Sequence, residues 1–184
     1  MITRQSYAPA AAYGAKVRKE GETWTLILTR DLRHTPELVW SALTDPAELR
    51  EWAPFEADRN LAAVGPVALS TVGAPVARTP QSTVTRVDPP RLLEYSWGEN
   101  AMRWELEPAG GGTRLTLWHS IGRKWVAMGA AGWHICLDVL GFMLDGHPIG
   151  RIVGGEAVSF NWKSLNAEYS KLFGVEEMNP PSAK

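Results

Sequence analysis

Cysteine is almost absent from this chain of 184 residues, and Cys136 is its single example. No disulfide can therefore form within the chain, and the fold depends on its apolar core. Cys136 lies in the apolar run 133–137, where we expect a buried, unreactive thiol. Hydrophobic residues make up 45% of the chain, which is ample for one packed domain.

An excess of charge of either sign is also missing. The formal net charge is −1 and the isoelectric point is near 6.4. Nucleic-acid binding and binding to an anionic membrane usually require a basic surface, so this balance predicts neither partner. A small neutral molecule or another protein fits the composition better.

Long apolar runs are lacking as well. No stretch of about 18 consecutive apolar residues occurs, so the sequence predicts no transmembrane helix. Residues 1–21 have no apolar block of the signal-peptide type, and we interpret them as an N-terminal extension of a cytoplasmic protein. At the other end, the proline-rich residues 175–184 are expected to form a disordered tail.

Tryptophan, in contrast, is abundant, with nine residues in the chain. Several of them fall on expected strands (Trp97, Trp104 and Trp118) and others on expected helices (Trp40, Trp52, Trp133 and Trp162). Indoles on both kinds of element place a large aromatic surface between a sheet and a helix. This distribution favours a pocket for an apolar small molecule.

The apolar pattern predicts a strand from 24 to 32, followed by two short helices. The first helix begins with Thr35 as its cap and Pro36 at its first position, and Asp45 caps the second. Further strands are expected at 67–72, 83–87, 93–97, 102–106 and 114–119. Because short turn sequences separate the last four strands, we expect them to form an antiparallel meander.

Pairing these strands through their turns predicts which side chains share a face. The core face collects Val84, Leu93, Tyr95, Trp97, Met102, Trp104, Leu106, Leu115, Leu117 and His119. On the opposite, solvated face, Glu107 is expected to lie opposite Arg114, and Arg103 to lie over the ring of Trp118.

From 128 to 144 the apolar period becomes helical, with Trp133, Leu137, Leu140 and Leu144 on one stripe. This helix is apolar on its other sides too, so we expect the N-terminal extension, the C-terminal segment or a second copy of the chain to cover it. If a second copy of the chain covers this helix, the protein is a homodimer. A final amphipathic helix is expected to bury Val158, Trp162, Leu165, Tyr169 and Leu172.

The order of these elements resembles the helix-grip fold of START-like and birch-pollen-allergen-like proteins, the SRPBCC superfamily. Local sequence resembles the activator of heat-shock-protein ATPase homologue family over 29–30, 36–46, Trp52, 132–138 and 162–169. The resemblance covers about residues 22–174. It implies an α+β fold in which a curved antiparallel sheet wraps around a long C-terminal helix, with two short helices after the first strand. It also implies an internal cavity.

The leading hypothesis is the binding of a small hydrophobic molecule in that cavity, without covalent chemistry. Its expected lining is Tyr95, Trp97, Met102, Trp104, Leu117, His119, Trp133 and Leu137. The register places His119 beside Trp97 and Met102, where its imidazole can orient a ligand or form a hydrogen bond within the core.

Two alternatives remain open. One is an enzyme like the polyketide cyclases and aromatases, with His119 or the pair His134 and Asp138 as acid and base. His134 and Asp138 lie one helical turn apart, so an imidazole–carboxylate hydrogen bond is easy to form, and a purely structural pair is the simpler interpretation. The other alternative is a stress-related interaction module that uses the apolar outside of helix 128–144. No compact metal-ligand motif occurs, and the sequence predicts neither a metal nor a cofactor.

Overall fold

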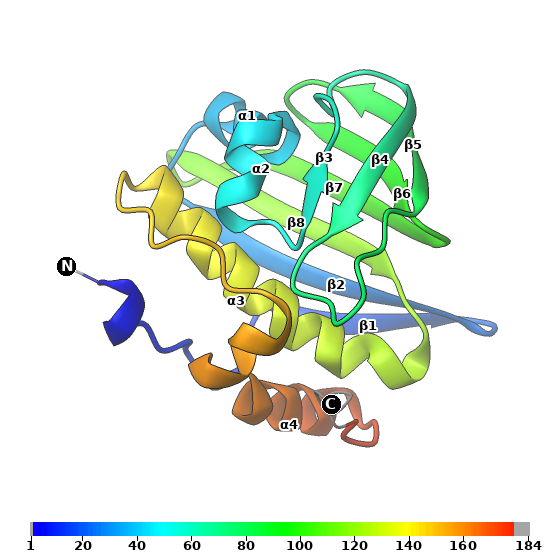
Figure 1. Ribbon diagram of the computed structural model, residues 1–184, viewed down its shortest axis with the longest axis vertical. Coiled ribbons are helices and arrows are strands. Elements are labelled where there is room, and N and C mark those ends of the chain that lie inside the picture. The colour runs from blue at the N-terminus through cyan, green and yellow to red at the C-terminus, as the bar shows by residue number, and fades with distance from the viewer. Residues whose placement is uncertain (1, 179–184) are drawn as a thin grey trace.

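The computed structural model describes residues 2–178 and shows one curled antiparallel sheet that holds a long helix (Figure 1). The eight strands lie in the order β1-β2-β8-β7-β6-β5-β4-β3. They are β1 (Ala15–Glu20), β2 (Thr23–Leu32), β3 (Phe55–Ala57), β4 (Gly65–Thr71), β5 (Gln81–Asp88), β6 (Leu92–Trp97), β7 (Asn100–Ala109) and β8 (Gly112–Ser120). The predicted α+β helix-grip fold is confirmed.

The described residues form four α-helices, of which the first three pack on the concave side of this sheet and the last packs against the third. They are α1 (Pro36–Thr44), α2 (Pro46–Trp52), α3 (Val126–Leu144) and α4 (Trp162–Phe173), with short 3-10 helices η1 (Arg4–Ser6), η2 (Arg123–Trp125) and η3 (Gly154–Phe160). The two short helices follow β2. Asp45 caps α2 through a 2.7 Å bond from the amide of Ala47, as predicted, whereas the side chain of Thr35 makes no capping bond to α1.

The predicted register of the meander is confirmed. Met102 lies opposite His119, Trp104 opposite Leu117, and Glu107 opposite Arg114. Of the ten side chains predicted for the core face, all are buried except that of Trp97, which is partly exposed. Alternation along β6 and β7 therefore places Tyr95, Trp97 and Trp104 on the face that carries α3.

The N-terminal segment contributes a strand that the sequence analysis treated as an extension. β1 pairs antiparallel with β2, with Val17 opposite Leu26, and forms one edge of the sheet. It also corrects the prediction for Trp118. The guanidinium of Arg18 lies 5.1 Å from the centre of that indole, whereas Arg103 forms ion pairs with Glu94 and Glu105.

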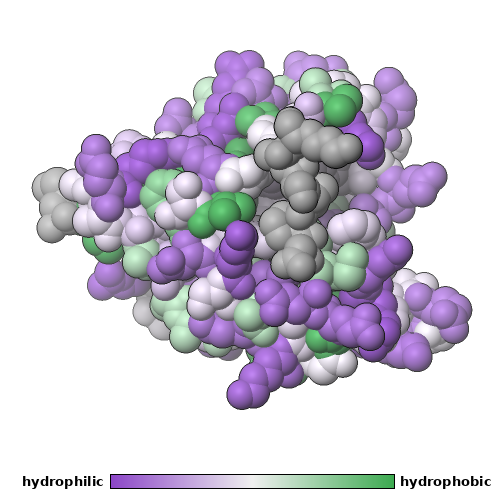
Figure 2. All heavy atoms as spheres, turned by 60° about the horizontal axis from the view of Figure 1, so that its bottom comes forward, coloured by the Kyte–Doolittle hydropathy of each residue, from purple (hydrophilic) through white to green (hydrophobic). Residues whose placement is uncertain are grey.

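Both ends of the chain cover the apolar sides of α3. Ile135 and Val139 are buried, and the ring of Phe142 packs edge-on against Tyr7 at 5.7 Å. On the face that carries α4, Figure 2 shows apolar residues scattered among polar ones. A second copy of the chain is therefore not needed to cover this helix. The segment Arg123–Leu144 has the length and composition of a membrane span, but 61% of its most apolar window is buried, which is typical of a core helix.

The C-terminal helix differs from its prediction in where it begins and in which residues it buries. α4 begins only at Trp162, because Asn161 before it adopts a left-handed conformation with φ of 58°. Val158 lies in η3 and is 37% exposed, and Leu172 is 55% exposed, so neither belongs to the buried stripe. Of the expected tail 175–184, Met178 accepts a 2.9 Å hydrogen bond from Asn166, and residues 179–184 lie outside the described part of the chain.

Candidate functional site

Three indoles meet in the space between the sheet and α3. The ring centres of Trp104 and Trp133 are 5.6 Å apart, and Trp52 lies 6.1 Å from the first and 6.5 Å from the second. These are edge-to-face and tilted contacts, and each of the three side chains is at most 3% exposed. The sequence analysis expected these indoles to face a hollow, but Trp104 and Trp133 are in direct contact.

His119 lies at one end of this aromatic cluster. The indole Nε1 of Trp133 donates a 3.1 Å hydrogen bond to Nδ1 of His119. Because Nδ1 is the acceptor, the neutral imidazole carries its hydrogen on Nε2. That Nε2 is buried and has no hydrogen-bond partner among residues 2–178. Burial lowers the pKa of His119 to about 4, so at neutral pH it presents an uncharged, unpaired donor.

The indole of Trp97 covers one face of the His119 ring. The two rings are stacked, with centres 6.3 Å apart and an interplanar angle of 27°. Trp97 also packs against Phe55 at 5.2 Å and against Trp133 at 6.2 Å. Unlike the three central indoles, Trp97 is partly exposed. Of the two indoles that contact His119, Trp97 is therefore the more exposed.

The eight predicted ligand-binding residues do not share one hollow. Trp97, Met102, His119 and Trp133 gather at the His119 end of the cluster. Tyr95, Trp104 and Leu117 pack in its closed part, where the hydroxyl of Tyr95 accepts a 2.9 Å bond from the indole of Trp104. Leu137 instead lines a separate surface hollow of about 210 Å³ beside Arg30 and Asp138.

Two members of the cluster were missed by the sequence analysis as site residues. Trp52 was assigned to the apolar side of its helix, and this position was a signal that it faces the core. Phe55 lies in β3, a strand of three residues that is too short to produce a recognisable alternation.

His134 belongs to a different polar network, on the side of α3 that faces α4. The hydroxyl of Tyr169 donates to the carbonyl oxygen of Tyr13 at 3.1 Å and lies 2.8 Å from Nδ1 of His134. Since a hydroxyl has one hydrogen, Nδ1 of His134 must be the donor in the second bond. The Nε2 atom of His134 is then an acceptor, and it lies 3.5 Å from the carboxylate of Asp138.

Asp138, one helical turn after His134, bonds to the N-terminal segment instead. The hydroxyl of Tyr7 donates a 2.7 Å hydrogen bond to Oδ2 of Asp138. Burial raises the pKa of Asp138, although the bond from Tyr7 opposes this rise. Burial and, secondarily, the nearby Arg30 lower the pKa of His134 to about 4. His134 and Asp138 share no hydrogen bond: Nε2 of His134 has no partner among residues 2–178, and each side chain bonds to a different segment of the chain.

His119 and His134 do not combine into one site. His119 bonds to Trp133 on the sheet side of α3, and His134 bonds to Tyr169 on the α4 side. Within the described residues, no group of three histidine, cysteine, aspartate or glutamate side chains is placed to hold a metal ion.

Replacing Tyr7 by phenylalanine tests the structural role of its bond to Asp138. We expect Tyr7→Phe to lower the free energy of unfolding by about 1–2 kcal/mol, because Asp138 stays half enclosed and loses its donor. Tyr13→Phe is the matched control, since Tyr13 is 47% exposed and the change keeps both its backbone carbonyl and the ring that packs against His134. Urea unfolding of the two variants measures the difference, and equal stabilities would show that the Tyr7 bond contributes nothing.

Comparison with known protein families identifies the family of this chain. The family model described as "Activator of Hsp90 ATPase homolog 1-like protein" matches residues 33–145, which is more than half of the sequence. The chain belongs to this family. Its matched region runs from the residues before α1 to the end of α3 and so contains the whole aromatic cluster. No curated protein matches the sequence.

Solved structures similar to this family member share its fold. A conserved protein of unknown function from Enterococcus faecalis has 19% identity and a TM-score of 0.66, over 88% of this chain and 92% of that one. CalU16 from Micromonospora echinospora, in its solution structure, has 22% identity and a TM-score of 0.67, over 91% and 95%. The AHSA1 protein of Silicibacter pomeroyi has 22% identity and a TM-score of 0.57, over 66% and 97%. At these identities the likeness shows the fold alone.

Proposed function

We propose that this protein binds a small apolar or aromatic molecule that carries one hydrogen-bond acceptor, without forming a covalent bond to it. The observation that carries this proposal is the unpaired Nε2–H of His119 within an aromatic surround. A buried donor without a partner costs about 1–3 kcal/mol. A carbonyl or hydroxyl oxygen of a ligand offsets this cost, and the indoles supply apolar contact.

The ligand is expected to lie at the His119 end of the cluster, between Trp97 and Met102, rather than between Trp104 and Trp133. Entry requires the partly exposed ring of Trp97 to move away from His119 and Phe55. Affinity comes mainly from burial of apolar surface, at roughly 25 cal/mol per Å². His119 sets the orientation of the ligand.

Two naphthalene probes test this proposal. We expect 2-acetylnaphthalene, which has a ketone oxygen, to bind more tightly than 2-ethylnaphthalene, which has the same carbon skeleton without the oxygen. The preference should be about tenfold, as expected for one hydrogen bond to an otherwise unpaired buried donor. Quenching of tryptophan fluorescence measures both affinities, and native mass spectrometry of the freshly purified protein shows whether a cellular compound is already bound.

The variant His119→Phe removes the donor and keeps an aromatic ring. It should bind both naphthalenes with similar affinity, whereas His147→Gln, a change in an exposed loop, should keep the preference for the ketone. Absence of saturable binding of either probe, together with absence of any retained compound, would contradict the proposal.

The alternatives have less support from the geometry. As a general base, His119 is weakened by a pKa near 4, and His134 and Asp138 are already engaged with Tyr169 and Tyr7. An interaction module that acts through the outside of α3 requires an open apolar face, but Ile135 and Val139 are buried by the chain itself. Neither observation favours an enzyme or a co-chaperone over a ligand-binding protein.

A further inference from the structure

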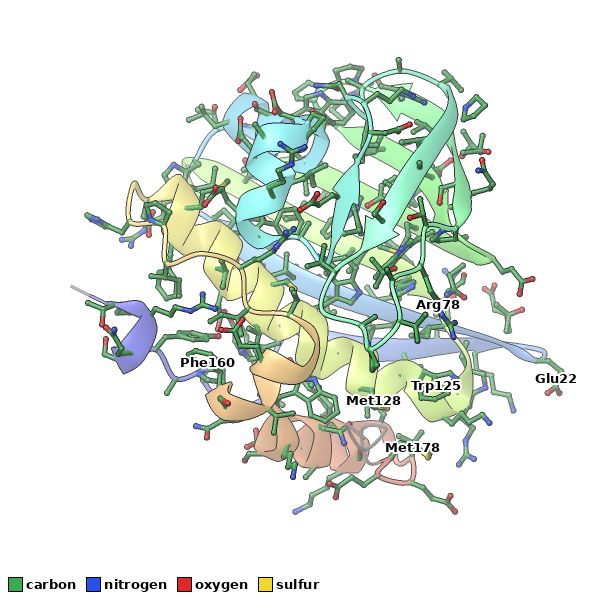
Figure 3. The ribbon with its side chains drawn as sticks, in the orientation of Figure 1. Glu22, Arg78, Trp125, Met128, Phe160 and Met178 are labelled. Carbon is green, nitrogen blue, oxygen red and sulfur yellow. The ribbon has the colours of Figure 1, made fainter. Side chains whose placement is uncertain are left out.

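Cations and indoles gather where the β1–β2 hairpin meets the connection from β8 to α3. We call this surface the cation–indole patch, and its members are Lys19, Trp24, Arg123, Lys124 and Trp125. Arg18 and Trp118 lie on the other face of the sheet, because they alternate with Lys19 and His119 along their strands. The backbone of Ile121 bonds to Trp24 at 2.9 Å and ties the two segments together. Figure 3 shows Glu22, at the hairpin tip, and Trp125, at the start of α3, on the same side of the molecule.

The cations of the patch lie on its indoles. The cationic groups of Lys19 and Arg123 both lie over the ring of Trp24, each 5.8 Å from the ring centre. Lys124 lies 5.8 Å from the centre of the Trp125 ring. Trp125 is 42% exposed, which is unusual for an indole in a chain with so large a core.

Two of these cations are in an unfavourable place with respect to α3. Arg123 and Lys124 directly precede this helix, at the positive end of its dipole. The first turn of α3 contains no acidic residue, and its cap residue Trp125 makes no side-chain capping bond. A cation at this end costs about 0.3–1 kcal/mol. An anionic partner at this surface would relieve that repulsion.

The charge of the patch is hidden in the total for the chain. The members of the patch include three cations (Lys19, Arg123 and Lys124) and no acidic residue, a local net charge of +3. The whole chain has a net charge of −1, so the remainder carries −4. The sequence analysis expected no surface for an anionic membrane because it considered only the net charge of the whole chain. The fold gathers positive charge in the patch, so that net charge does not describe this surface.

We propose that the cation–indole patch docks this protein on a bilayer that contains anionic lipid. Lysine and arginine reach lipid headgroups along their apolar stems, and indoles favour the boundary between headgroups and acyl chains. Single-stranded nucleic acid fits less well, because the cations of the protein already lie on the indole faces on which bases would stack. With about 1 kcal/mol for each cation near the surface, the attachment is weak and reversible.

This proposal does not depend on ligand binding, but the two surfaces are neighbours. His119 pairs with Leu26 on β2, two residues from Trp24. The patch therefore lies at the end of the sheet where the proposed ligand site is found. An apolar ligand partitions into bilayers, so docking on a bilayer would bring the proposed binding site close to ligand dissolved in the membrane.

Co-sedimentation with vesicles tests the proposal. The protein should bind vesicles of phosphatidylcholine with about 30% phosphatidylserine, and bind pure phosphatidylcholine far less, with an affinity that falls as salt rises. The double variant Arg123→Glu/Lys124→Glu should lower the partition coefficient at least about tenfold. Lys163→Glu/Lys171→Glu on α4 makes the same change in total charge at exposed positions and should keep near-native binding.

Three results would overturn the proposal. They are equal binding to the two kinds of vesicle, an equal loss in the α4 control, and tighter binding to a single-stranded oligothymidylate than to the anionic vesicles. Thermal melts show whether the charge variants fold. The variant Trp125→Ser leaves the net charge unchanged and should lower vesicle binding severalfold. This result would support the proposal independently of charge.

Discussion

Trp104→Ala should lower the free energy of unfolding by about 3–5 kcal/mol, because it opens a large cavity in the closed part of the core. The Trp104 side chain is 1% exposed and meets Trp52 and Trp133 edge-on. Its Nε1–H bond to the hydroxyl of Tyr95 is lost as well, which leaves a second buried polar group without its partner. Urea unfolding, monitored by far-ultraviolet circular dichroism, measures the effect.

Trp125→Ala provides the control for this measurement. It removes an indole of the same size from a position that is 42% exposed, so it should change stability by less than about 1 kcal/mol. Similar effects of the two substitutions would show that Trp104 and Trp133 are not in close-packed contact, and that the hollow expected from the sequence exists after all.

Acid should destabilise the protein between pH 6.5 and about pH 4. Burial lowers the pKa of both His119 and His134 from 6.5 to about 4. In this window the unfolded chain binds protons that the folded chain does not, so stability is complete above pH 6.5 and is lost as the pH falls. Each histidine accounts for up to roughly 3 kcal/mol. Asp138, whose pKa is raised, acts in the opposite sense at the acidic end.

Single histidine variants separate the contributions of His119 and His134 to this loss of stability. We expect His119→Gln to remove about half of the loss between pH 6.5 and pH 4, measured as the difference between urea unfolding at the two pH values. His147→Gln, in an exposed loop, should leave the pH dependence as it is. A pH profile that is flat in the unmodified protein would mean that neither imidazole is held neutral by burial.

The faces of the meander could be predicted from the sequence, whereas the strand at the sheet edge could not. Alternation along β7 and β8 fixes which side of the sheet Trp104 and His119 occupy, because the side-chain period of a strand is two. In β1, Lys16, Arg18 and Lys19 hide any apolar alternation. Such charges are typical of edge strands, which must avoid pairing with other chains.

The packing of the site also lay beyond the sequence. A register gives the face on which an indole lies, but the space left between Trp104 and Trp133 depends on the distance between the sheet and α3. The partners of His134 could not be predicted either. Tyr169 is 35 residues away along the chain, and only the docking of α4 brings its hydroxyl to the imidazole.

The tautomer of His119 tests the central claim most directly. In protein labelled with ¹⁵N-histidine, long-range proton–nitrogen spectra at pH 7 report the protonation of each ring nitrogen. We predict a neutral ring with its hydrogen on Nε2, and a shift of the Nε2 resonance when 2-acetylnaphthalene binds but not when 2-ethylnaphthalene is added. A ring with its hydrogen on Nδ1, or an Nε2 resonance that the bound ketone leaves unchanged, would contradict the account.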